Sequence, residues 1–174
     1  IERFDLGAVS RNPAVFDVAK LEWMNGHYLP AMPVAEFVTG TLPLVERDIG
    51  RTLSPGEREA FTAVAPFVQE RAKRLTDVAA QVRFLVEDEI VYDPASWDKV
   101  MATSDARVAL DGAAAALDSL DVWSVTAVEA AMRGMLERTG LSAGKGLQPI
   151  RVAVTGSSVS PPLFESLTAL GRER

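Results

Sequence analysis

The sequence of 174 residues predicts an all-α fold, a helical bundle of two lobes. Three observations lead to this prediction. Residues that cap helix N-termini recur along the chain, often directly before a proline. Apolar residues follow these caps at the spacing of one helix face. One segment is rich in alanine, the strongest helix former. The helices are short and closely connected, which suggests two lobes that meet near residues 92–104.

Four helices are expected before residue 75. Asn12-Pro13 begins the first helix and Asn25-Gly26 ends it. Two short helices follow over residues 34–38 and 42–49, and a glycine closes each of them.

A capping box begins the fourth helix, because Ser54 and Pro55 are followed by Glu57 three residues after the serine. Pro66 has no N–H, so a kink or break is expected there. Basic residues then gather near the end of this helix: Arg71, Lys73 and Arg74.

The second half of the chain contains further caps. Helices are expected to begin at Leu75, at Asp93-Pro94, at Ser104, and at either Ser124 or Thr126. If Thr126 is the cap, it forms a capping box with Glu129. Gly140 should end this helix, and residues 141–146 should form a flexible loop.

The last segment is ambiguous in part. Residues 151–155 have the composition of a strand, whereas Gln148-Pro149 before them could begin a helix. Ser160-Pro161-Pro162 predicts the start of the final helix, and Gly171 its end. The polar turn of residues 155–158 separates the two elements.

Composition excludes several kinds of chemistry. Cysteine is absent and His27 is the only histidine, so disulfides, thiol catalysis, cysteine–zinc sites and histidine metal clusters are excluded. We therefore expect no metal and no cofactor in this chain. No apolar run reaches the roughly 18 residues of a membrane span, and no secretion signal is present, so we expect a cytoplasmic protein without membrane contact. Ile1 stands where an initiator methionine would be, which predicts a fragment of a longer protein.

Neither the net charge of the chain nor its local motifs indicate a catalytic residue. The net charge of −6 argues mildly against nucleic acid, although phosphate binding needs only local positive charge. Residues 140–146, GLSAGKG, fail as a phosphate-binding loop because three residues instead of four separate the glycines and Gly146 follows Lys145. The carboxylates of residues 87–93 are expected to form a hydrated surface.

Two segments resemble bacterial glutamyl-tRNA synthetases. Residues 16–17 and 20–29, FD and KLEWMNGHYL, are similar to the "FD..KL.WMN..Y" segment of that family. Residues 151–174 are similar to its "RVAxTGS…sPpLfe…LGxER" run. Because the segments stand at opposite ends, in the order of the family and at about its spacing, the resemblance covers nearly the whole chain.

The resemblance implies a cage of helices that binds the anticodon, with a helix at residues 151–155. Residues 1–92 would form the stem-contact end and first helical lobe, and residues 93–174 the C-terminal anticodon-binding lobe. These enzymes are class I glutamate–tRNA ligases, which attach glutamate to tRNA with ATP and Mg²⁺. Their HIGH and KMSKS motifs are absent here, so that chemistry is expected upstream and this chain should be inactive alone.

The resemblance also implies site residues. Arg151 corresponds to an arginine that contacts an anticodon base, and Ser160, Pro161 and Leu163 fall where the family lines the pocket of another base. One residue among Arg71, Lys73 and Arg74 corresponds to the reader of the third base, which helps decide whether tRNA for glutamine is accepted beside tRNA for glutamate. Arginine suits this task because it both stacks on splayed bases and donates to their edges.

A different interpretation is a helical protein–protein interaction module without RNA binding. It would require a contiguous exposed apolar surface, and it leaves the two terminal motifs unexplained. On the preferred interpretation the partners are tRNA and the upstream catalytic domain of the same chain, in a monomer.

Overall fold

The computed structural model describes residues 16–174, and every regular element in this range is a helix. The all-α prediction is therefore confirmed. The first elements are α1 (Val18–Ala31), α2 (Val34–Ile49), α3 (Pro55–Gln69), η2 (Leu75–Asp77), α4 (Val78–Val82) and η3 (Arg83–Leu85). They are followed by α5 (Pro94–Val100), α6 (Ser104–Asp118), α7 (Val125–Thr139), α8 (Ala143–Thr155) and α9 (Leu163–Leu170).

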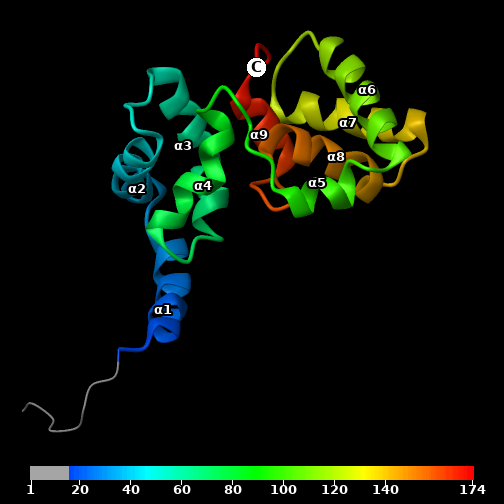
Figure 1. Cartoon of the computed structure of the whole chain (residues 1–174). Helices are drawn as coiled ribbons and strands as arrows, with labels where there is room; N and C mark the ends of the chain where they lie inside the picture. Colours follow the sequence, from blue (N-terminus) through cyan, green and yellow to red (C-terminus); the bar gives the residue numbers. More distant parts are fainter. Residues whose placement is uncertain (1–15) are drawn as a thin grey trace, which may run out of the picture.

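The helices form two groups that lie side by side, with α1 projecting from the first (Figure 1). Helices α2, α3 and α4 make up the body of the first group, and α5 to α8 make up the second. Helix α9 packs on α3 of the first group and on α7 of the second. The last helix of the chain thus joins the two groups.

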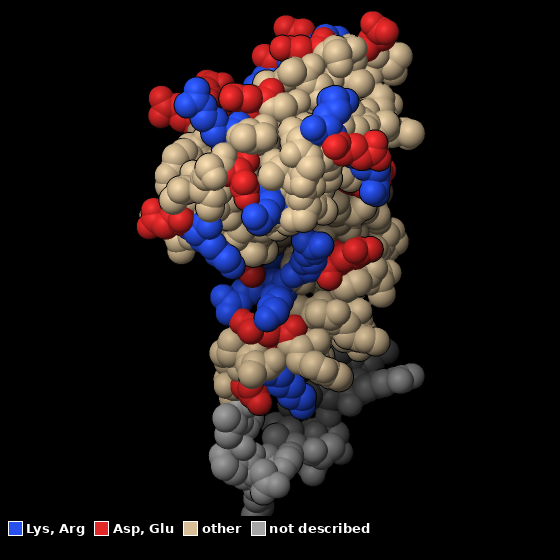
Figure 2. Space-filling view, turned by 90° about the vertical axis from the view of Figure 1, so that its right-hand side faces the viewer, with Lys and Arg blue, Asp and Glu red and all other residues tan. Residues whose placement is uncertain are grey.

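Lys and Arg side chains gather in one area of the surface. Figure 2 shows this basic area in the middle of the face that it draws, between the larger part of the molecule and the end that carries α1. The net charge of the chain is −6, so the basic area is a local feature. Local positive charge is what phosphate binding requires.

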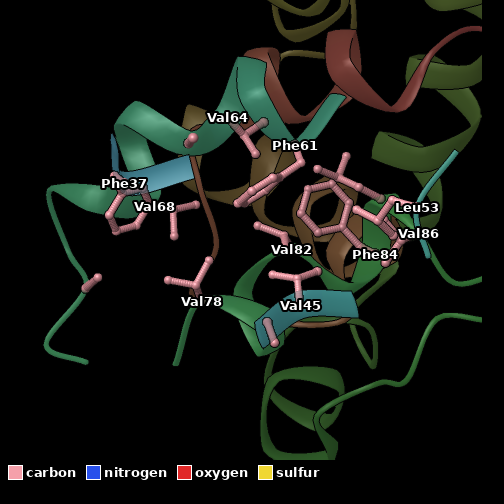
Figure 3. Packing of buried hydrophobic residues seen from close by; sticks show 14 of the residues in the cluster. Phe37, Val45, Leu53, Phe61, Val64, Val68, Val78, Val82, Phe84 and Val86 are labelled. Atoms are coloured by element: carbon pink, nitrogen blue, oxygen red, sulfur yellow. The ribbon is translucent and has the colours of Figure 1, made fainter. Parts of the chain in front are cut away.

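Each group of helices has its own apolar cluster. In the first, Phe37, Phe61 and Phe84 pack among valines from α2, α3 and α4 (Figure 3). The second is built around Met132, Met135, Val128, Ile150, Leu163 and Leu167. Val154 packs against both clusters, which places it where the groups meet. The proposed division into residues 1–92 and 93–174 stays a prediction.

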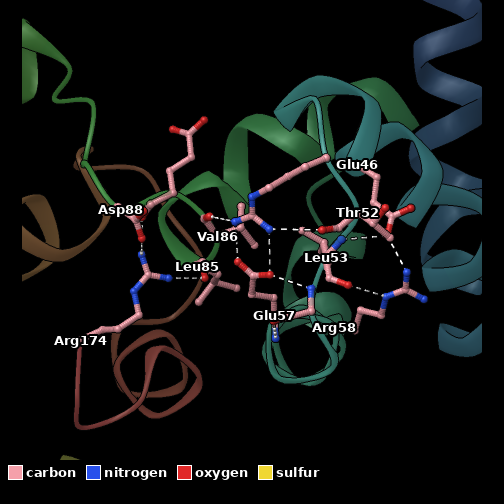
Figure 4. Close-up of polar contacts among 12 residues, drawn as sticks. Glu46, Thr52, Leu53, Glu57, Arg58, Leu85, Val86, Asp88 and Arg174 are labelled. Atoms are coloured by element: carbon pink, nitrogen blue, oxygen red, sulfur yellow. Dashed lines mark hydrogen bonds and ion pairs between the residues drawn. The ribbon is translucent and has the colours of Figure 1, made fainter.

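The predicted capping box at the start of α3 is confirmed, and it is part of a polar network. Ser54 accepts the Glu57 N–H, and the Glu57 carboxylate accepts the Ser54 N–H at 2.7 Å. Arg51 donates to both oxygens of the same carboxylate, at 2.9 and 2.6 Å, and to the Val86 carbonyl (Figure 4). These hydrogen bonds, those from Arg51 above all, lower the pKa of Glu57 to about 2.

The first helix differs from its prediction at both ends. Asn12-Pro13 lies outside the described residues, and Asp17 caps the helix, which runs past Gly26 to Ala31. Tertiary hydrogen bonds explain this extension. Asn25 donates to the Lys73 carbonyl at 2.9 Å, and the Gln69 side chain donates to the Leu29 carbonyl at 2.6 Å.

The two short helices predicted over residues 34–49 are one continuous helix, α2. Phe37, Thr41 and Val45 are buried at intervals of four residues, and this packing outweighs the low helix propensity of Gly40 and Pro43. Helix α3 likewise continues through Pro66 to Gln69, so no break occurs there.

In the second group, the predicted starts at Asp93 and near Ser104 are confirmed. Ser124 is the cap of α7, and the Thr126–Glu129 capping box is wrong, since Glu129 pairs with Arg133 instead. The predicted loop at residues 141–146 is also wrong. Residues 143–146 are the first turn of α8, where Gly146 lies against the side chain of Leu136, with no room for a Cβ atom.

Candidate nucleic-acid interface

The candidate site is built around the segment that joins α8 to α9, residues 156–162, here called the recognition loop. Gly156 ends α8 in the left-handed region at φ 77°, which glycine adopts without a steric penalty. The helix predicted at residues 151–155 is confirmed as part of α8. Ser160 does not cap α9, because that helix begins at Leu163.

Arg151 holds the recognition loop from within the second group. Its Nη1 donates to the Ser160 Oγ at 2.6 Å, to the Pro161 carbonyl at 2.7 Å and to the Ser160 carbonyl at 3.4 Å. The Ser160 hydroxyl is therefore engaged by the arginine, which explains why it does not serve as a helix cap. Ser160 and Pro161 are both buried beneath this guanidinium.

Arg71 reaches the same loop from the first group. Its Nη1 donates to the Ser160 carbonyl at 3.0 Å, so two guanidinium groups converge on one peptide. Burial lowers the pKa of Arg151, and the neighbouring charge of Arg71 lowers it further. The charge of Glu165 on α9 raises the pKa of Arg151. Two close positive charges favour a group with negative charge or a carbonyl oxygen at this position.

The two arginines retain donors beyond these contacts. A guanidinium carries five N–H groups, and within residues 16–174 the hydrogen bonds of Arg71 and Arg151 all come from Nη1. The Nε and Nη2 edges can therefore donate to base edges or phosphates while Nη1 keeps the loop in place.

The other two basic candidates lie elsewhere. Arg74 forms an ion pair with Glu22 of α1. Lys73 lines a cavity of about 520 Å³ beside α1, together with Trp23 and His27. The structure thus brings Arg71 to Arg151 and leaves Lys73 and Arg74 at the end that carries α1.

Leu163 is only 4% exposed and belongs to the apolar cluster of the second group. A direct base contact by its side chain stays a prediction. The basic residues near the C-terminal end are also dispersed. Lys145 pairs with Asp105. Arg172 donates to two carbonyls at the C-terminal end of α6, and Arg174 to two at the C-terminal end of η3.

Sequence reasoning missed a cleft between α3 and α9. Its volume is about 590 Å³, and its lining includes Ala60, Ala63 and Phe67 of α3 and Glu165 of α9. The helical spacing of the α3 residues is the signal of a core face, so the sequence offered no reason to expect an open cleft. Glu165 of this lining is also the carboxylate that raises the pKa of Arg151.

Within residues 16–174, no group of three or more His, Asp or Glu side chains could hold a metal ion. No helix in this range combines the length and the apolar character that crossing a bilayer requires.

Comparison with known proteins places this site in context. The family model described as "Anticodon binding domain" matches residues 32–174. The chain is 39% identical to a glutamate–tRNA ligase of Acidothermus cellulolyticus and 40% identical to one of Saccharopolyspora erythraea. These alignments cover 100% and 99% of this chain, but the chain spans only 35% of either relative.

A solved structure of a glutamate tRNA ligase from Elizabethkingia meningosepticum, in complex with its amino acid, has a similar fold. The TM-score is 0.75 at 22% identity, over 98% of this chain and 33% of that one. At this identity the likeness supports the fold alone.

Proposed function

The chain belongs to the anticodon-binding domain family, and from this premise we propose that it recognises the anticodon of tRNA for glutamate as one part of a glutamate–tRNA ligase. The observation that carries the proposal is the convergence of Arg71 and Arg151 on the Ser160 carbonyl. Anticodon bases are unpaired, and proteins read such bases by stacking and by hydrogen bonds to their edges.

Each part of the site has a role in this proposal. Arg151 donates to one anticodon base and Arg71 to another, each through its Nε and Nη2 edge. Ser160 and Pro161 form the floor of the site, held at their carbonyls by both arginines. The proposal assigns the reader of the third base to Arg71, because Arg74 is engaged by Glu22 and Lys73 faces the cavity at α1.

The remaining parts of the reaction belong to the rest of the parent protein. ATP and Mg²⁺ would be bound there, since the described residues hold no acidic cluster suited to a metal ion and the chain has no HIGH or KMSKS motif. The parent would act in the cytoplasm as a monomer. Residues 1–92 would form the stem-contact end and the first helical lobe, and residues 93–174 the C-terminal anticodon-binding lobe.

A tRNA titration tests this function. The chain alone should bind tRNA for glutamate weakly, and affinity should fall as salt rises because phosphate contacts release counterions. It should neither charge tRNA nor exchange pyrophosphate. An affinity that changes neither with the salt concentration nor with the anticodon sequence would refute the proposal and favour a protein–protein interaction module.

A further inference from the structure

We infer that Ser96, in the first turn of α5 where the chain enters the second group of helices, is a positioning residue that holds the recognition loop and thereby sets anticodon discrimination. This inference rests on the proposed function. Ser96 is 5% exposed, so it acts through the loop and makes no RNA contact of its own.

Ser96 holds the loop through its hydroxyl group. The Ser96 Oγ accepts the N–H of Ser158 at 3.0 Å and lies 2.9 Å from the Ser158 Oγ, within a second hydrogen bond. Ser96 is itself fixed, because its own N–H donates to Asp93 Oδ2 at 2.8 Å in the first turn of α5. The hydroxyl therefore presents a fixed acceptor to the middle of the loop.

The segment that leads into α5 touches the loop at a second point. The Asp93 N–H donates to the Gly156 carbonyl at 2.8 Å. A Cβ atom at Gly156 would collide with the carbonyl oxygen of Val91, which shows how closely the two backbones approach. Residues 91–96 therefore hold the loop from its start to Ser158.

The loop is thus restrained on both sides of one residue. Ser158 is bound by Ser96, whereas Ser160 is bound by Arg71 and Arg151. Only Val159 stands between them, with its side chain 80% exposed. Loss of the bond at Ser158 would let Ser160 and Pro161 shift relative to the two guanidinium groups.

The chemistry of the pair favours a single loop position. Buried hydroxyl groups cost free energy unless they are hydrogen-bonded. The two serines satisfy each other only when the loop lies in this register. Two apolar residues would tolerate small displacements, so a serine pair specifies the position better than an apolar contact of the same size.

Four variants of the 174-residue chain test the inference: Ser96→Ala, Ser96→Thr, Ser158→Ala and Ser119→Ala. Ser96→Ala removes both bonds to Ser158, and Ser158→Ala removes only the bond between the hydroxyl groups. Ser119→Ala is the control, because it likewise removes a part-buried serine hydroxyl, one that donates to the Ala116 carbonyl at the end of α6, far from the loop in the sequence. Two quantities are measured: hydrogen exchange at the Ser158 amide, and the ratio of the Kd values for two RNAs. One RNA is a stem-loop with the glutamate anticodon, and the other differs in one anticodon base.

In Ser96→Ala, exchange at the Ser158 amide should be about tenfold faster and the Kd ratio about fivefold smaller, as expected for the loss of one or two hydrogen bonds. Ser158→Ala should lower the ratio less, and it still tests the inference if Ser96→Ala does not fold. Ser96→Thr, which keeps the hydroxyl, should restore the ratio, and Ser119→Ala should change neither quantity.

Unchanged exchange at Ser158 in Ser96→Ala would overturn the inference. Faster exchange with an unchanged Kd ratio would also overturn it, and would reduce Ser96 to a structural role. If the wild-type chain binds both RNAs equally, the proposed function fails and the inference fails with it. The exchange measurement separates these cases because it involves no RNA.

Discussion

Arg71 and Arg151 donate to the same oxygen atom, the carbonyl of Ser160, at 3.0 and 3.4 Å. Arg71 follows α3 of the first group, and Arg151 lies in α8 of the second. A contact of this kind ties the recognition loop to both groups of helices. As far as residues 16–174 are concerned, both guanidinium groups keep N–H edges without a partner beside this peptide, which suits the recognition of base edges and phosphates.

Arg151→Ala is expected to reduce discrimination at one anticodon base by about 1–3 kcal/mol, the value of a good bidentate contact. Arg151→Lys should restore little, because an ammonium group cannot hold Ser160 and Pro161 while it donates to a base. The measurement is steady-state charging by the full enzyme of tRNAs changed at single anticodon bases.

Melting of both Arg151 variants serves as the folding control. An equal loss of charging for every tRNA would mean that Arg151 binds the RNA backbone and does not read a base. Unchanged charging with a lower melting temperature would give it a structural role only.

Arg71→Ala and Arg74→Ala should behave differently, although the residues are three positions apart. Arg71 contacts the recognition loop, so its loss should weaken discrimination at a single base, different from that of Arg151. Arg74 pairs with Glu22 at α1, so its loss should change binding of all tRNAs alike and lower the salt dependence. Both variants are measured with the same set of tRNAs. A loss at a single base in Arg74→Ala, with a uniform change in Arg71→Ala, would assign the reading of the third base to Arg74.

Much of the fold follows from local signals that act within one turn of helix. Asp93 and Ser124 cap their helices through a side-chain acceptor, and Gly50 and Gly140 end theirs at positive φ. Such features depend on a few neighbouring residues, so sequence patterns identify them.

The errors concern residues whose role is decided by distant partners. The sequence pattern predicts helix ends at Gly26 and Gly40, yet tertiary contacts allow both helices to continue through these residues. Gly146 is small because Leu136 lies against it, not because the chain turns there. Ser160 has the pattern of a cap, but Arg151 takes its hydroxyl. Among the basic candidates, only the tertiary structure could separate Arg71 from Lys73 and Arg74.

Gly156→Ala should destabilise the chain by at least about 2 kcal/mol. Part of the cost is the left-handed backbone, about 1–2 kcal/mol for a residue with a Cβ atom, and the rest is the collision with the Val91 carbonyl. Gly144→Ala is the matched control. It lies in the first turn of α8 with open space around it, so it should be neutral or stabilise by up to about 1 kcal/mol.

Denaturant unfolding of both glycine variants measures the difference. Equal stability of Gly156→Ala and the wild type would mean that the loop does not pack closely on the connection at Val91.

Stability should fall in acid through Glu57. The pKa of Glu57 is lowered from 4.5 to about 2 in the folded chain, mainly by the hydrogen bonds from Arg51. Its contribution to stability is therefore complete above pH 4.5 and is lost as the pH falls towards 2, because the unfolded chain takes up the proton first. Glu57→Gln should remove this part of the pH dependence.

Unfolding midpoints at a series of pH values test this expectation. Glu59→Gln removes the same charge from an exposed position on α3. It should leave the dependence of the unfolding midpoint on pH unchanged in acid. An identical slope for Glu57→Gln and the wild type would show that the pair with Arg51 contributes nothing to acid stability.

The central claim is that the 174-residue chain reads anticodon bases, and binding of small RNAs tests it most directly. Two stem-loops are compared at one low salt concentration, one with the glutamate anticodon and one with all three anticodon bases replaced. Replacement of the anticodon bases should weaken binding by about tenfold or more, as expected when base contacts are lost. A third RNA with altered stem pairs should bind like the first. Equal Kd values for the first two RNAs would contradict the account, because the arginine pair would then bind only the phosphate backbone.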